Sequence, residues 1–132
     1  VQKLTEANFD DNIFNLADAV GRSDKALALE LINKQLGMGT APIYLLSMIV
    51  RQFRILIQIK EAIGNTNYVN NAVVAKELGL HPFVVQKSMT QVKNYSMEKL
   101  KQIYQSLLEL DIQLKSSKLS ADVLFSRLVI SN

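Results

Sequence analysis

Residues that could carry out chemistry are scarce in this chain. There is one histidine, His81, and no cysteine, so thiolate chemistry is excluded and a single imidazole cannot hold a metal ion alone. The sequence has no glycine-rich phosphate loop of the GxxxxGK or GxGxxG type, and no helix with paired carboxylates and a histidine at metal-ligand spacing. We therefore expect no catalytic residue, no cofactor and no metal, and we expect that this chain is not itself an enzyme.

His81 directly precedes Pro82, at a position typical of the start of a helix. An imidazole at such a position can accept a hydrogen bond from a free N–H of the first turn. A role in proton transfer is the alternative. We expect the structural role as a cap.

The segment from Val74 to Tyr95 fits the positions of a helix-turn-helix, with Ala75 as the small residue, Gly79 in the turn and Val85 buried. In that register five residues would face a DNA groove: His81, Phe83, Gln86, Lys87 and Thr90. This set has one firm positive charge and no arginine, which is little for reading DNA. A helical hairpin within a bundle has the same pattern, so a DNA-binding regulator stays open as an alternative.

Four basic residues are candidates for contacts with a partner or with DNA phosphates: Arg51, Arg54, Lys115 and Lys118. The two arginines belong to a polar stripe whose spacings alternate between three and four, formed by Tyr44, Ser47, Arg51, Arg54, Gln58 and Glu61. Lys115 follows Asp111 by one helical turn, which predicts an ion pair. Solvated surface charges are the ordinary explanation for all four residues. The net charge of +3 is scattered, so we expect weak and non-specific attraction to DNA.

The elements that position these residues are all helical by their pattern. With only 5 glycines and 2 prolines, the chain lacks the material for many tight turns. We expect about seven helices in one all-α domain covering residues 1–132. The expected starts are Asn8, Ser23, Pro42, a position near Asn71, Pro82, Ser96 and Ser120, and the expected breaks include Gly21, residues 37–40, Gly64 and Gly79.

Ile43 to Ile63 is apolar enough to suggest a membrane helix, but Arg51, Arg54, Lys60 and Glu61 interrupt it. We interpret this segment as the central helix of a bundle, with neighbours on most sides, and expect no membrane contact. The chain starts at Val1 without the features of a signal peptide, so we expect a fragment of a cytoplasmic protein, with residues 1–10 as a linker from a preceding region.

Four segments together resemble one known family. They are NIFNLADAVG at residues 12–21, residues 45–60 with their RQFR motif, AKELGLHPFV at 75–84, and LELDIQLKS at 108–116. Their order and spacing are similar to those of the delta subunit of bacterial DNA polymerase III, across nearly the whole chain. The asparagine-rich loop at 65–71 and Lys118, near which relatives often have glycine, are departures.

The resemblance implies the helical collar domain of a clamp loader, a non-catalytic domain that joins subunits during DNA replication. It implies the gamma or tau and the delta prime subunits as partners in a hetero-pentamer, with primer-template DNA reached through the assembled complex. The sliding clamp would be bound only by an N-terminal domain that this chain lacks. The parent complex would be the DNA polymerase III holoenzyme, in the bacterial cytoplasm.

Overall fold

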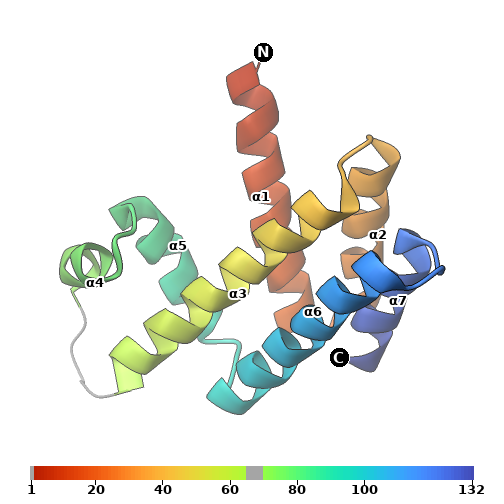
Figure 1. The fold of residues 1–132 in the computed structure, drawn as a ribbon. Helices are drawn as coiled ribbons and strands as arrows, with labels where there is room; N and C mark the ends of the chain where they lie inside the picture. Colours follow the sequence, from red (N-terminus) through yellow and green to blue (C-terminus); the bar gives the residue numbers. More distant parts are fainter. Residues whose placement is uncertain (1, 65–69) are drawn as a thin grey trace.

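The part of the chain that the structure describes consists of seven helices and contains no strand (Figure 1). The structure is a computed structural model that describes residues 2–64 and 70–132, with side chains from Phe9 onward. The helices are α1 (Gln2–Gly21), α2 (Lys25–Gly37), α3 (Pro42–Gly64), α4 (Asn71–Leu78), α5 (Pro82–Val92), α6 (Met97–Ser116) and α7 (Ala121–Ser131). The expected all-α class is confirmed. Most of the expected loop at 65–71 lies outside the described residues.

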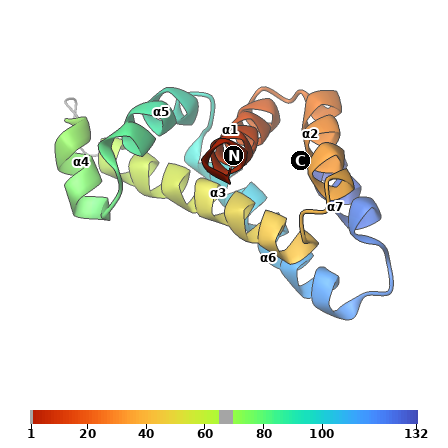
Figure 2. The same cartoon turned by 90° about the horizontal axis from the view of Figure 1, so that it is seen from above.

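The helices are arranged in two layers. α3 and α6 run side by side in opposite directions and form one layer, while α1, α2, α5 and α7 lie behind them (Figures 1 and 2). α1 and α5 both pack on α3, α7 packs on α6 and on α2, and α4 extends the bundle beside α5. One face of the α3 and α6 layer is therefore not covered by any of the described helices.

α3 is the central helix, as its pattern predicts. Its buried side chains are Leu45, Leu46, Ile49, Phe53, Ile55, Leu56 and Ile59. Its polar stripe, by contrast, is exposed at nearly every position, including Arg51 and Arg54. α3 is the one described helix long and apolar enough to cross a membrane by length and composition alone. Burial of its apolar side chains among α1, α4, α5 and α6 accounts for that composition.

Several helix ends lie where local signals predict them. Pro42 is the first residue of α3, and the Ser96 hydroxyl accepts a hydrogen bond from the Lys99 N–H, 3.0 Å away. Gly79 ends α4 in the left-handed conformation, at φ 69°. His81 caps α5, because its Nδ1 accepts a hydrogen bond from the Phe83 N–H at 3.0 Å. The expected capping role of His81 is confirmed.

Three other helix ends differ from expectation. α1 begins at Gln2 instead of near Asn8. α2 is capped by Asp24, whose carboxylate accepts from the Leu27 N–H, and the expected cap Ser23 instead adopts a positive φ of 59°. Ser120 occupies the expected cap position of α7 but makes no side-chain hydrogen bond to it. Ser and Asp are both favoured at N-caps. Here Ser23 takes the left-handed conformation after α1, with the Asp24 N–H donating to the Ala19 carbonyl at 2.8 Å, so Asp24 is left as the cap of α2.

Gly21, an expected break, ends α1 without a left-handed conformation, because its φ is not positive. A Cβ at this position would lie 2.7 Å from Cε2 and 2.8 Å from Cζ of Tyr95. Tyr95 is buried, its ring packs edge-on against Phe53, and its hydroxyl donates to the Ala17 carbonyl. The glycine therefore permits the close approach of the Tyr95 ring to the last turn of α1.

Candidate interaction surfaces

The uncovered face of the α3 and α6 layer combines apolar and basic side chains. Arg54 of α3 donates from Nη2 and Nε to the Tyr104 hydroxyl of α6, at 3.2 and 3.4 Å. The two helices are antiparallel, so the residues before Arg54 lie beside the residues after Tyr104 (Figure 1). This brings Ile43 of α3 to the same face as Leu108 and Ile112 of α6, all three exposed. We call the surface formed by Ile43, Arg54, Tyr104, Leu108 and Ile112 the α3–α6 face.

The two candidate lysines lie at the end of α6 and just beyond it. The Lys115 ammonium is 3.0 Å from Asp111 Oδ2, so the predicted pair between them is formed, on a partly exposed surface. Lys118 is exposed in the turn between α6 and α7. The structure thus separates the four candidates: Arg54 and the end of α6 belong to the α3 and α6 layer, whereas Arg51 lies on another flank of α3.

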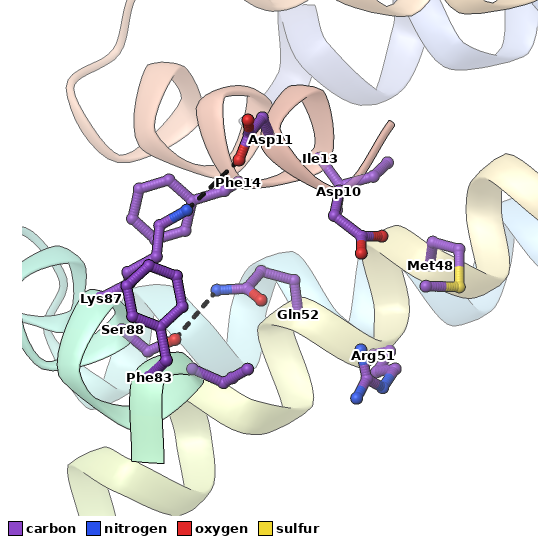
Figure 3. A pocket seen from close by; sticks show the side chains of 11 residues that line it. Asp10, Asp11, Ile13, Phe14, Met48, Arg51, Gln52, Phe83, Lys87 and Ser88 are labelled. Atoms are coloured by element: carbon purple, nitrogen blue, oxygen red, sulfur yellow. Dashed lines mark hydrogen bonds and ion pairs between the residues drawn. The ribbon is translucent and has the colours of Figure 1, made fainter. Parts of the chain in front are cut away.

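Arg51 lines a groove between α1 and α5, with α3 as its floor (Figure 3). The two helices each pack on α3 but reach one another mainly through long side chains, which leaves a hollow of about 270 Å³. Asp10 and Met48 lie with Arg51 at one end, and Phe83 and Lys87 lie at the other (Figure 3). We call this the α1–α5 groove.

The Lys87 side chain is held in place by contacts with other residues of the same chain. Its ammonium is 3.4 Å from Asp11 Oδ1 and lies 4.6 Å from the ring centroid of Phe14 and 5.4 Å from that of Phe83. Cation–π contacts of this kind add to the ion pair in fixing the ammonium. The helix-turn-helix positions are met, with Ala75 and Val85 buried. However, Lys87, the one firm cation among the residues expected to face DNA, packs against α1.

A buried amide network behind the groove links three helices. Gln91 of α5 is 1% exposed, accepts a hydrogen bond from Gln52 of α3 at 3.0 Å and donates to the Phe14 carbonyl of α1 at 2.9 Å. Sequence reasoning missed Gln91 and Gln52. The available signal was weak: each glutamine stands next to an apolar residue of its helix's buried face, Val92 and Phe53.

Comparison with known proteins gives consistent matches. The family described as "DNA polymerase III delta subunit, C-terminal domain" matches residues 10–132. The DNA polymerase III subunit delta of Bacillus subtilis strain 168 is 28% identical over 118 residues, covering 89% of this chain and 33% of that protein. The solved structure of the Bacillus subtilis DNA clamp loader delta protein matches with a TM-score of 0.84 at 26% identity, covering 93% of this chain and 36% of that chain.

The chain thus spans about a third of the length of the relatives that it matches. The family match covers six of the seven helices completely and α1 from Asp10, and the structural match extends to the arrangement of the helices. The stand-alone regulator considered above has no support from these comparisons. The chain belongs to the DNA polymerase III delta subunit family and contains that subunit's C-terminal domain.

Proposed function

We infer that this domain is a non-catalytic assembly domain, which joins a delta subunit to the other subunits of a clamp loader. Membership in the delta family supports this role, as does the similarity to a protein described as a DNA clamp loader delta protein. The partners are the gamma or tau and the delta prime subunits, in a hetero-pentamer. Residues 1–10 connect the domain to the preceding region of the subunit, which binds the sliding clamp, and the complex acts in the cytoplasm.

The α3–α6 face is the observation that carries this proposal. Ile43, Leu108 and Ile112 are 41%, 42% and 65% exposed on two adjacent helices, with no described helix covering them. Single exposed apolar residues are common, but a contiguous group rimmed by polar residues marks interaction sites. Arg54 and Tyr104 are of the types enriched at the centres of protein interfaces, and their mutual hydrogen bond already fixes both side chains.

Contact with DNA follows assembly in this proposal. Lys115 and Lys118, at the end of α6 and in the turn after it, face primer-template DNA only as part of a ring of several subunits, whereas Arg54 belongs to the α3–α6 face. The isolated chain has a net charge of +3 and binds duplex DNA weakly, with affinity that falls steeply as salt is added.

The test is to mix this chain with the corresponding helical domains of the other subunits and to measure complex formation by sedimentation or calorimetry. Replacing Ile112 by lysine should weaken association by at least about tenfold, because an interface then has to bury a charge. Ile130→Lys on α7 is the matched control, since Ile130 is 60% exposed but lies away from the α3–α6 face. Equal effects of the two variants, or no complex with the unmodified chain, would contradict the proposal.

A further inference from the structure

The α1–α5 groove has features of a binding site that the assembly role does not use. Its floor and walls bring apolar side chains, Ile13, Met48 and Val84, together with two charged residues at the rim, Asp10 and Arg51. From α3 the groove is lined by Met48, Arg51 and Gln52, and neither Arg54 nor Ile43 of the α3–α6 face lines it. A side chain inserted in the groove would therefore contact residues other than those of the α3–α6 face.

The size of the groove restricts what it can hold. Pockets for cofactors and drug-sized molecules span about 300–1,000 Å³ and enclose most of the ligand. The hollow here measures about 270 Å³ and is open along one side, so it suits one or two side chains that project from a larger partner. Anchor side chains in pockets of this kind supply much of the affinity of protein interfaces.

The charges at the rim of the groove indicate which residues of the partner lie next to such an anchor. Among the described residues, neither Asp10 nor Arg51 has an ion-pair partner, and both are exposed. Lys87 and Asp11 already satisfy one another at the opposite end. The unused positive and negative charges are thus both at the Met48 end, where they can pair with an acidic and a basic residue of the occupant (Figure 3).

Phe83 extends the apolar surface beyond the hollow. Its ring is 58% exposed at the rim of the groove, although the amphipathic pattern of α5 would allow a polar residue there. Large aromatic side chains are enriched at interfaces because they bury a large area with few rotatable bonds. We propose that the α1–α5 groove is a second docking site, for a peptide segment of another protein that carries an apolar anchor next to a basic and an acidic residue.

The probe for this proposal is a library of random peptides displayed on phage, selected on the whole 132-residue chain. The expected result is a consensus with a large apolar residue and, close to it, one basic and one acidic residue. Synthetic peptides of that consensus should bind at least about tenfold more weakly to Arg51→Glu and to Asp10→Lys, because each change opposes like charges. Reversing the matching charge of the peptide should restore binding to each variant.

Arg127→Glu on α7 is the matched control for Arg51→Glu, since Arg127 is also an exposed arginine without an ion pair among the described residues. Circular dichroism checks that each variant is folded. The proposal is overturned by peptides without a common anchor, by equal binding to Arg51→Glu and Arg127→Glu, or by binding that Ile112→Lys abolishes. The proposal is also overturned if binding of a duplex oligonucleotide requires Arg51 while binding of no peptide does. Association with other clamp-loader subunits is measured separately and should be unchanged in Arg51→Glu.

Discussion

Replacing Gly21 by alanine tests the close approach of α1 and Tyr95. The new methyl group would lie 2.7–2.8 Å from two carbons of the Tyr95 ring, which the surrounding core prevents from moving freely. Overpacking of a core costs about 1–3 kcal/mol. A displaced ring would also lose its buried hydrogen bond to the Ala17 carbonyl, at about 1–3 kcal/mol. The better helix propensity of alanine offsets at most about 1 kcal/mol.

The expected result is a decrease of about 2–4 kcal/mol in the free energy of unfolding, measured by urea denaturation followed by circular dichroism. Gly37→Ala is the matched control, because Gly37 also ends its helix, has no positive φ and has no atom within 4 Å of an added Cβ. We expect that control to be neutral or slightly stabilising. In a Tyr95→Leu background, where the ring is absent, Gly21→Ala should cost little. The reasoning is refuted if Gly21→Ala is no more destabilising than Gly37→Ala.

Three further predictions concern buried or capping groups. His81→Ala should lower the free energy of unfolding by about 0.5–2 kcal/mol, since the Phe83 N–H loses its acceptor, and His81→Asn should retain most of the stability in the same denaturation assay. Gln91→Ala should cost about 2–4 kcal/mol, because it opens a cavity and leaves the Phe14 carbonyl without its donor; a loss below 1 kcal/mol would contradict the network. Burial, with a smaller effect of Asp18, raises the pKa of Tyr95 above its ordinary value of 10.0, so the folded state holds this proton more tightly than the unfolded state. Stability should therefore be unaffected by this group below pH 10.0 and fall above it, and the fall should be smaller in Tyr95→Phe when denaturation is measured across alkaline pH.

The sequence predicts those features that local chemistry determines. The start of α3 at Pro42 and the left-handed end of α4 at Gly79 follow from the backbone preferences of proline and glycine. The central position of α3 follows from its narrow polar stripe, because only a helix with several neighbours can bury the rest of its circumference. The Asp111 and Lys115 pair follows from their spacing on one helix.

Features that depend on two distant segments were not predicted. The role of Gly21 depends on where the Tyr95 ring lies, and periodicity carries no information on that position. Gln91 looks like a surface residue until Gln52 and the Phe14 carbonyl are brought to it by the packing of α5 on α3 and α1. The separation of Arg51 from Arg54 depends on which neighbour occupies each flank of α3. Helical spacing places both arginines in one stripe and cannot assign the neighbours.

The central position of α3 has a consequence for how the molecule opens. α1, α4, α5 and α6 all rest on α3, whereas α2 and α7 make their main contacts with one another and with α1 and α6. The α2 and α7 pair is also held at its end by Lys25 and Lys99, which donate to the carbonyls of Ile130 and Asn132. Amide hydrogen exchange should accordingly be slowest in α3 and faster in α7, whose release leaves the packing around α3 intact. The domain can thus lose its C-terminal edge in a partial opening, whereas exposure of the buried side chains of α3 requires unfolding of the whole chain.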